Sequence, residues 1–483
     1  MLATMSLKRF LELAKSQSRI AVFKEISGDS LTLVNAYNAL SKDYNGISIL
    51  ESCDRNAPSG KYSYLCLEPY AEFVSSSCQA TNPFVELQKQ LLIHQCYFEH
   101  QLCRYTGGAL GFISYDAIRL IENIPDSHSA AIDIPDLFFR FYQINIVFDH
   151  DSDKVVVSIA TEIGDDPSKD YQKSMQVIED IISKLHSKNS VDKVETEVKR
   201  KQSSDISVDI SDDQYMQIVA KAKQYIVDGD AFQIVLSRTF KKKFTASPFD
   251  IYRALRITNP SPYMFYLEYD DLVIVGASPE KLVSVKDGAV ETNPIAGTRP
   301  RGCNEAEDRE LAQELLQDEK EVAEHMMLVD LGRNDFGAVC VPGSVKVIKL
   351  KEIQKLSCVM HITSSVAGEL DKNKNNIDAI KAVFPAGTLT GAPKIRAMEI
   401  IDELETSKRG LYGGAICIID NQNNLDACIA IRMAVLKDQV ASVRTGAGIV
   451  FDSDPKCEAQ ETKHKAKAVL AAIDLAEGGG LCS

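Results

Sequence analysis

Four glutamates stand in two pairs with the same spacing. Glu321 and Glu324 are three residues apart in EVAEHMMLVDLGRND, and Glu458 and Glu461 repeat that spacing in EAQETKHKAKAVL. The apolar residues of each segment recur at helical spacing, so each pair shares one helix face, where like charges repel unless a cation lies near. Four carboxylates from two helices suit a hard cation that keeps several waters. The sequence therefore predicts a Mg²⁺ site, with solvated surface pairs as the alternative.

Three glycine-rich segments in the C-terminal half offer backbone and hydroxyl groups to an anion. PIAGTRPRG contains Gly297 and Thr298, FPAGTLTGAPK places Thr388 before a predicted helix, and TGAGIV contains Gly446 and Gly448. Glycine lets a ligand approach the backbone, and a helix N-terminus favours negative charge. Each segment alone is typical of a turn. Together with the glutamates they indicate a small anionic substrate.

Two polar residues stand in apolar segments that read as strands. Arg432 lies in ACIAIRMAVL and His361 in CVMHITSSV. A buried guanidinium is costly unless a carboxylate meets it, so Arg432 either closes a structural ion pair or binds an acidic ligand. A lone histidine in a strand is either a core residue or a catalyst. With the magnesium site, these residues point to a substrate that carries more than one carboxylate.

The elements that must position these residues mix strands and helices without a regular βαβ order. Alternating residues over 138–149 and 154–161 predict a hairpin, and a capping box at Ser211 predicts a helix start. A long acidic helix is expected over 305–331, and one apolar strand over 427–436. This mixture predicts an α+β fold with large, mostly antiparallel β-sheets packed with helices.

The composition changes at one place along the chain. Residues 184–210 are poor in large apolar side chains and rich in charge and serine, which is typical of a linker. We expect an N-terminal region at 1–183, this linker, a C-terminal region at 211–475 and a flexible tail at 476–483.

Overall charge and cysteine spacing exclude several classes of protein. With 54 basic and 68 acidic residues the net charge is −14, which argues against nucleic acid or an anionic membrane as the main partner. No apolar run resembles a secretory signal or a membrane span, so a cytoplasmic protein is expected. The twelve cysteines include no C-x-x-C pair, so neither a zinc ribbon nor a dithiol redox motif is predicted.

Long segments of the C-terminal half carry a family resemblance. They resemble, in the same order, the signature blocks of the chorismate-utilising enzymes, and most closely those of anthranilate synthase component I: PIAGTRPRG, EVAEHMMLVDLGRND, MHITSSVAGEL, GTLTGAPKIRAMEII, GLYGGAICII and GAGIVFDSDPKCEAQET. The resemblance covers residues 210 to 475 and, more loosely, the N-terminal half. It implies the fold of that family.

The resemblance also implies a binding site. Glu324 and Glu461 would bind magnesium, with Glu321 and Glu458 supporting it through water. The metal would hold the ring carboxylate of chorismate. The residues implied in contact with the substrate are Gly297, Thr298, Tyr412, Arg432, Gly446, Ala447, Gly448 and Lys465.

Catalytic roles follow from the same resemblance. Glu280, in GASPEKL, matches the general acid that protonates the departing C4 hydroxyl, and His361 matches the histidine linked to pyruvate elimination. Thr388 counts among the catalytic residues. A positioned carboxylic acid suits this step because hydroxide is a poor leaving group.

Two positions separate relatives within the family. Gln233 stands at the position where the water-using members of the family are similar in having a lysine that activates water. A neutral amide cannot act as that base, which favours ammonia as the nucleophile. Ala296 stands where aminodeoxychorismate synthases have a nucleophilic lysine. The resemblance therefore implies a lyase that makes anthranilate and pyruvate, the first committed step of tryptophan biosynthesis. Aminodeoxyisochorismate or aminodeoxychorismate synthase, or a non-catalytic subunit that binds chorismate or tryptophan, are the alternatives.

Partners are implied as well. The chain shows no glutamine amidotransferase motif, so ammonia would come from a separate glutaminase subunit in a hetero-oligomer. ILESCD and NPSPYMF resemble the family's feedback site for L-tryptophan, which implies contacts with the inhibitor from Ser52, Pro262, Tyr263 and Met264.

Overall fold

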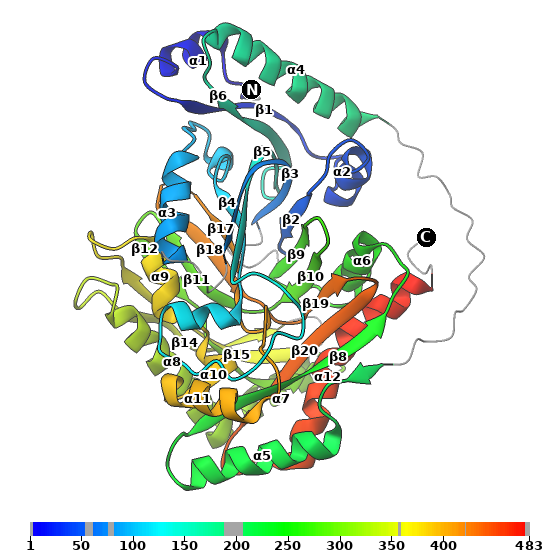
Figure 1. Ribbon diagram of the computed structural model, residues 1–483, viewed down its shortest axis with the longest axis vertical. Coiled ribbons are helices and arrows are strands. Elements are labelled where there is room, and N and C mark those ends of the chain that lie inside the picture. The colour runs from blue at the N-terminus through cyan, green and yellow to red at the C-terminus, as the bar shows by residue number, and fades with distance from the viewer. Residues whose placement is uncertain are drawn as a thin grey trace.

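The computed structural model describes residues 3–53, 61–75, 82–187, 206–355, 359–420 and 422–478. Residues 188–205 of the expected linker and 479–483 of the expected tail lie outside these ranges. The described chain forms one branched antiparallel sheet system with helices on its outside (Figure 1), which confirms the predicted α+β class. None of its described helices is both long enough and apolar enough to cross a membrane.

The helices and strands have the following bounds. The helices are α1 (Leu7–Leu13), α2 (Leu33–Leu40), α3 (Pro83–Ile93), α4 (Pro167–His186), α5 (Asp212–Val227), α6 (Pro248–Thr258), α7 (Glu305–Gln317), α8 (Glu319–Gly337), α9 (Asn376–Val383), α10 (Gly387–Thr390), α11 (Lys394–Leu404) and α12 (Pro455–Glu477), with short 3₁₀ turns at Gln101–Cys103 and Tyr115–Leu120. The strands are β1 (Arg19–Ser27), β2 (Ser48–Glu51), β3 (Tyr62–Ser75), β4 (Ala109–Ile113), β5 (Leu137–Asp149), β6 (Lys154–Glu162), β7 (Ser207–Val208), β8 (Gln233–Lys243), β9 (Tyr263–Glu268), β10 (Val273–Ser278), β11 (Lys281–Lys286), β12 (Ala289–Thr292), β13 (Ile295–Pro300), β14 (Lys346–Lys355), β15 (Val359–Glu369), β16 (Gly391–Ala392), β17 (Ala415–Ile419), β18 (Leu425–Ile429), β19 (Met433–Lys437) and β20 (Val440–Ile449).

The sheet divides into two branches at β5, which pairs with β3, β4 and β6. One branch continues from β3 through β2, β9, β10, β19 and β20 to β8. The other continues from β4 through β17, β18, β11 and β12 to β15, which also pairs with β13 and β14. Both branches thus contain strands from the two halves of the sequence.

The two branches pack face to face over apolar side chains. Phe265 and Ile274 of the first branch share a buried cluster with Leu110 and Ile416 of the second. At the far ends, helix α12 packs on β20, and α8 packs on β13 and β15. Helices α12 and α8 therefore cover the far ends of the two branches.

Sequence signals of local origin are confirmed. The hairpin β5–β6 forms with Asp149 opposite Lys154. Ser211 accepts from the Gln214 N–H at 3.3 Å and Gln214 accepts from the Ser211 N–H at 2.9 Å, which completes the capping box of α5. Both signals depend on neighbouring residues alone.

Two predicted elements are each divided in the structure. The expected helix over 305–331 ends at Gln317, because the Asp318 side chain accepts the N–H groups of Lys320 and Glu321 and caps a new helix. The expected strand over 427–436 is broken at Arg432, which has a left-handed φ of 52°. There the chain leaves one branch of the sheet and enters the other.

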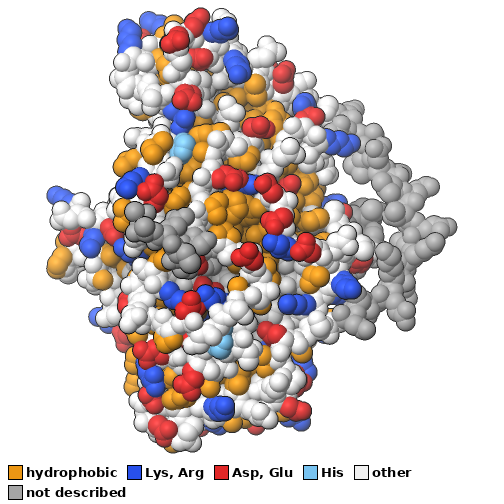
Figure 2. All heavy atoms as spheres, viewed as in Figure 1, with side chains coloured by type: hydrophobic (Ala, Val, Ile, Leu, Met, Phe, Trp, Pro, Cys, Tyr) orange, Lys and Arg blue, Asp and Glu red, His pale blue; other side chains and the backbone are white. Residues whose placement is uncertain are grey.

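Surface charge agrees with the composition. On the face in Figure 2, lysine and arginine side chains are interspersed with aspartate and glutamate, and they do not form one continuous basic area on that face. This arrangement is unlike the concentrated basic face of a nucleic-acid-binding protein.

Candidate active site

One cavity of about 540 Å³ lies where the two sheet branches end, between α8 and α12. The predicted residues that line it are Gln233, Glu280, Gly297, Thr298, Glu321, Glu324, His361, Thr388, Tyr412, Arg432, Gly446, Gly448, Glu458, Glu461 and Lys465. Ala447 does not line it: side chains alternate along β20, so Ala447 is buried on the opposite side with Ile234 and Leu236. Its side chain therefore faces away from the cavity.

The four glutamates project into this cavity from two helices. Burial and the neighbouring Glu324 raise the pKa of Glu321, and burial together with Glu461 raises the pKa of Glu458. Lys465 Nζ lies 2.6 Å from Glu461 Oε1, and Arg299 Nη1 lies 3.7 Å from Glu321 Oε1.

The four glutamates are oxygen donors of the kind that magnesium prefers, but they do not form one compact group. Across the described ranges, no three acidic, histidine or cysteine side chains form a group that could hold a metal. The chemistry of the set nevertheless fits Mg²⁺, because carboxylates are hard oxygen ligands, and within each pair the neighbouring carboxylate adds to the burial that raises the pKa of Glu321 and Glu458.

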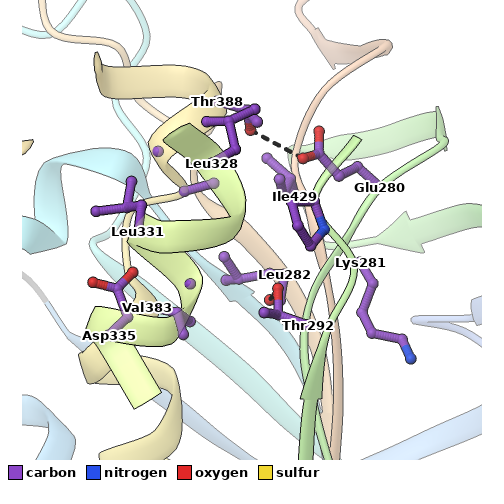
Figure 3. Close-up of a pocket in the computed structure, with 14 residues that line it drawn as sticks. Glu280, Lys281, Leu282, Thr292, Leu328, Leu331, Asp335, Val383, Thr388 and Ile429 are labelled. Atoms are coloured by element: carbon purple, nitrogen blue, oxygen red, sulfur yellow. Dashed lines mark hydrogen bonds between the residues drawn. The ribbon is translucent and has the colours of Figure 1, made fainter. Parts of the chain in front are cut away.

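Glu280 lies in the crossover from β10 to β11, where the chain passes between the sheet branches. Its side chain is 8% exposed, and burial raises the pKa of Glu280 to about 8. Thr388 Oγ1 donates to Glu280 Oε1 at 3.1 Å, as Figure 3 shows. This hydrogen bond, the Ile295 N–H and the charge of Lys465 lower the pKa without cancelling the effect of burial. At neutral pH Glu280 therefore holds a proton that it can donate.

A smaller chamber of about 40 Å³ lies behind this acid. Glu280, Thr388 and Leu328 line both the chamber and the main cavity. Figure 3 shows the two apolar walls of the chamber and Asp335 at the end remote from Glu280, and Asp335 is paired with Lys394 at 2.8 Å. The chamber accounts for the apolar surroundings that disfavour ionisation of Glu280.

His361, on β15, has a defined tautomer. Its Nδ1 lies 3.1 Å from the Gly297 carbonyl oxygen and 3.0 Å from Thr298 Oγ1. Because a carbonyl can only accept, Nδ1 carries the hydrogen, and Nε2 of the neutral ring is left as an acceptor. Burial lowers the pKa of His361, so the ring is neutral at physiological pH and able to take a proton.

Three glycines of the site leave little room for a Cβ atom beside neighbouring site groups. Gly297 has a φ of 73°, and a Cβ there would lie 3.1 Å from Glu321 Oε2. A Cβ at Gly446 would lie 2.8 Å from the Tyr412 hydroxyl, and one at Gly448 would lie 2.7 Å from Gln233 Nε2. The glycine-rich segments therefore leave room for neighbouring side chains as well as for a ligand.

Arg432 lies at the second crossover between the branches, from β18 to β19. Its backbone carbonyl accepts from the Ala277 N–H at 3.0 Å, but its guanidinium makes neither a hydrogen bond nor an ion pair with any described residue, and burial lowers the pKa of that group. The structural ion pair considered from the sequence is therefore not formed. A cation without a partner in a cavity is suited to an anionic ligand.

Gln233 begins β8 at the cavity wall. Its Nε2 donates to Glu324 Oε1 at 2.8 Å, which fixes the orientation of the amide. Its Oε1 is buried and has no hydrogen-bond partner within the described part of the chain. An acceptor is thus available to a nucleophile that carries N–H groups.

A second cavity, of about 50 Å³, gathers the four residues predicted to contact an inhibitor. Ser52, Pro262, Tyr263 and Met264 all line it, where β2 pairs with β9. The Ser52 hydroxyl is buried without a partner among the described residues, and Tyr263 Oη donates to Asp426 at 3.2 Å. The structure thus brings these residues together at a distinct site.

Sequence reasoning missed other residues of the main cavity. Val235, Leu389, Lys320 and Arg444 also line it. Arg444 had a recognisable signal, because it is a single arginine in the apolar segment just before TGAGIV, as Arg432 is in ACIAIRMAVL. Val235 and Leu389 are ordinary apolar residues, and only the tertiary structure identifies them.

Comparisons with known proteins agree with this geometry. The model of the chorismate binding enzyme family matches residues 50–471. Anthranilate synthase component 1 of Aquifex aeolicus (strain VF5) is 38% identical over 98% of each chain, and that of Acetivibrio thermocellus is 47% identical over 78% of this chain and 76% of its own.

Solved structures show the same fold. The crystal structure of anthranilate synthase component I from Streptococcus pneumoniae TIGR4 superposes with a TM-score of 0.75 at 38% identity, covering 92% of this chain and 99% of that one. The menaquinone-specific isochorismate synthase MenF from Escherichia coli shares the fold, with a TM-score of 0.72 at 19% identity and coverage of 97% and 98%. The chain therefore belongs to the chorismate binding enzyme family.

Proposed function

We propose that this chain is component 1 of an anthranilate synthase, a lyase that converts chorismate and ammonia into anthranilate, pyruvate and water. The observation that carries the proposal is the cavity that combines the protonated acid Glu280, the base His361 and the neutral amide Gln233. The named relatives support the same reaction.

Each residue is assigned one task. Glu280 gives its proton to the C4 hydroxyl as that group leaves as water, while ammonia adds at ring carbon C2. The Gln233 oxygen accepts an N–H of the ammonia and directs its lone pair to the ring. The ammonium group formed at C2 returns one proton to Glu280. His361 Nε2 then takes the C2 proton as the C–O bond to the enolpyruvyl arm breaks, and it gives that proton to the methylene carbon of the arm, which leaves as pyruvate.

The substrate carboxylates are assigned to opposite sides of the cavity. Arg432 and Tyr412 would bind the carboxylate of the enolpyruvyl arm, and Thr298 and Lys465 would face the ring carboxylate. Glu324 and Glu461 would hold Mg²⁺, with Glu321 and Glu458 behind them. When bound, the metal would supply positive charge to the ring carboxylate.

We expect anthranilate formation to require magnesium. The purified chain is incubated with chorismate, ammonium salt and Mg²⁺ at a pH of about 8, where part of Glu280 is still protonated, and anthranilate is followed by its fluorescence. An excess of chelator should abolish the signal and added Mg²⁺ should restore it, since the ring carboxylate and four glutamates would otherwise repel one another. Activity that survives complete chelation would refute the metal assignment.

The same assay decides between the alternatives. Chorismate consumed without anthranilate would indicate aminodeoxyisochorismate or aminodeoxychorismate synthase. No consumption at all would indicate a subunit that only binds chorismate or tryptophan. Because the free chain would use ammonium, glutamine should support the reaction only after a glutamine amidotransferase partner is added.

We further propose that the second cavity, lined by Ser52, Pro262, Tyr263 and Met264, binds L-tryptophan as a feedback inhibitor. Ser52→Ala removes a hydroxyl that is buried without a partner, so uninhibited kcat should not change. Loss of one hydrogen bond to the inhibitor, worth about 1–1.5 kcal/mol, should raise the tryptophan concentration for half inhibition about 5–10-fold. Inhibition curves of both proteins measure this, and identical curves would contradict the assignment.

A further inference from the structure

A single buried carboxylate lies between two arginines behind the cavity wall. Glu405, 3% exposed, pairs with Arg409 at 2.6 Å and with Arg444 at 2.6 Å, and it also accepts the N–H and the hydroxyl of Ser237 at 2.8 Å each. Burial opposes ionisation, but the charges of the two arginines outweigh it and lower the pKa of Glu405. The group is therefore a permanently ionised anchor.

Arg409 extends from this anchor to two segments of the wall. It is 5% exposed and donates to the carbonyl oxygens of Leu389 and Val235, each at 2.6 Å. Leu389 directly follows Thr388, which holds the acid, and Val235 is two residues after Gln233 on the same face of β8. One planar guanidinium therefore fixes the spacing between the acid side and the nucleophile side of the cavity.

Arg444 lines the cavity, yet its donors are directed away from it. Nε donates to Ser237 Oγ at 2.8 Å, and Nη1 donates to Lys408 O at 2.8 Å and Ser407 Oγ at 3.1 Å. Nη2 donates to Glu405 Oε2 at 2.6 Å and to Ser407 O at 3.4 Å. All five N–H groups are thus used within the protein. Arg444 is arranged to hold the wall, in contrast to the unpaired Arg432.

We propose that Glu405, Arg409 and Arg444 form a positioning cluster that holds Thr388 and Gln233 at the separation required for acid and nucleophile to act together. Its hydrogen bonds and ion pairs are made within the protein, so we place its action behind the reacting atoms. Its task is to make the wall rigid, because errors of about 1 Å in the placement of reacting groups can cost about 100-fold in rate. The proposal rests on the proposed function, whose catalytic groups it positions.

The decisive variant is Arg409→Lys. Lysine keeps the charge beside Glu405, but its single ammonium group cannot reach both the Leu389 and the Val235 carbonyl oxygens in the fork geometry. We expect kcat, per folded molecule, to fall about 10–100-fold, with a much smaller change in the KM for chorismate. We expect kcat to change more than KM because the residues that bind chorismate remain, while their alignment with the acid Glu280 is lost.

Arg140→Lys is the matched control. Arg140 is also buried, at 2% exposed; it donates to Glu72 and to the Glu268 carbonyl, each at 2.6 Å, and its guanidinium lies 4.8 Å from the Tyr269 ring centre. It lies away from the cavity, on β5. This variant should lose comparable thermal stability and keep wild-type kcat and KM.

The pH profile supplies a readout that lost stability alone would not move. Arg409 restrains Thr388, whose hydrogen bond lowers the pKa of Glu280; the Ile295 N–H and Lys465 face the same carboxyl group. Loosening Thr388 should raise the pKa of Glu280, so the acid stays protonated to higher pH. The ratio of Arg409→Lys to wild-type rates should therefore rise above pH 8, while the Arg140→Lys ratio stays flat.

Two further measurements keep the test decisive. If Arg409→Lys does not fold, Arg444→Lys, which also keeps the charge, takes its place with the same expected split. Amide hydrogen exchange on the unliganded proteins should be faster around 233–237 and 386–392 in the cluster variants than in wild type or Arg140→Lys. If the cluster variants show the same hydrogen exchange and the same activity as Arg140→Lys, the proposal is overturned. If the wild-type protein forms no anthranilate, only the proposed function is overturned.

Discussion

Glu280→Gln should lower kcat for anthranilate formation by about 10²–10⁴-fold, the usual contribution of a positioned general acid. Glutamine keeps the shape of the side chain and can accept the Thr388 hydrogen bond, but it has no proton of suitable acidity for the leaving hydroxyl. The KM for chorismate should change little, because Glu280 is uncharged at neutral pH and contributes no charge to binding.

The activity of wild type and of Glu280→Gln should depend differently on pH. Burial raises the pKa of Glu280 to about 8, so wild type should lose the active, protonated form as the pH rises through 8. Glu280→Gln should lack this alkaline limb, and the variant-to-wild-type ratio should rise with pH. The ratio removes the separate effect of pH on the supply of ammonia.

Glu268→Gln is a suitable control for this experiment. Burial also raises the pKa of Glu268, which accepts a hydrogen bond from Tyr266 Oη and lies at the end of β9 in the first sheet branch, outside the cavity. It should retain wild-type kcat and the alkaline limb. Substantial activity in Glu280→Gln would remove the acid role from Glu280.

Arg432→Met should raise the KM for chorismate about 30–1,000-fold, equivalent to the 2–4 kcal/mol typical of truncating one partner of a buried charge pair. The expected loss is large because the guanidinium of Arg432 has no partner among the described residues, whereas the donors of Arg444 in the same cavity are used within the protein. Initial rates over a range of chorismate concentrations measure it.

The same substitution should leave the free energy of unfolding unchanged or raised. Burial lowers the pKa of Arg432, which means that the folded protein without ligand disfavours this charge. Methionine also faces the same left-handed φ of 52° as arginine, so the substitution adds no new backbone strain. A lower unfolding free energy together with an unchanged KM would show that Arg432 is structural.

Arg396→Met provides the comparison. Arg396 is partly exposed and pairs with Asp230 at 2.9 Å and Glu399 at 2.8 Å. Removing it should reduce stability slightly and leave the KM for chorismate at the wild-type value. Arg432→Met should therefore weaken chorismate binding without loss of stability, whereas Arg396→Met should lose some stability without a change in chorismate binding.

The amino-acid sequence by itself determined what depends on neighbouring residues. The spacing of Glu321 and Glu324 placed both on one face of α8, the Ser211 capping box started α5, and the alternation of β5 and β6 predicted their hairpin. These signals are local because helix and strand periodicity fix which side chains share a face. Alternation would also have placed Ala447 away from the cavity.

Only the tertiary structure decided how distant segments meet. Gln233 and Glu324 are 91 positions apart and are joined by a hydrogen bond, and Glu280 and Arg432 face the cavity because the chain crosses between sheet branches at both. The Asp318 cap and the left-handed Arg432 divide segments whose hydrophobic pattern is continuous. Strand pairing over such separations is set by the packing of the whole core, which periodicity along one chain does not encode.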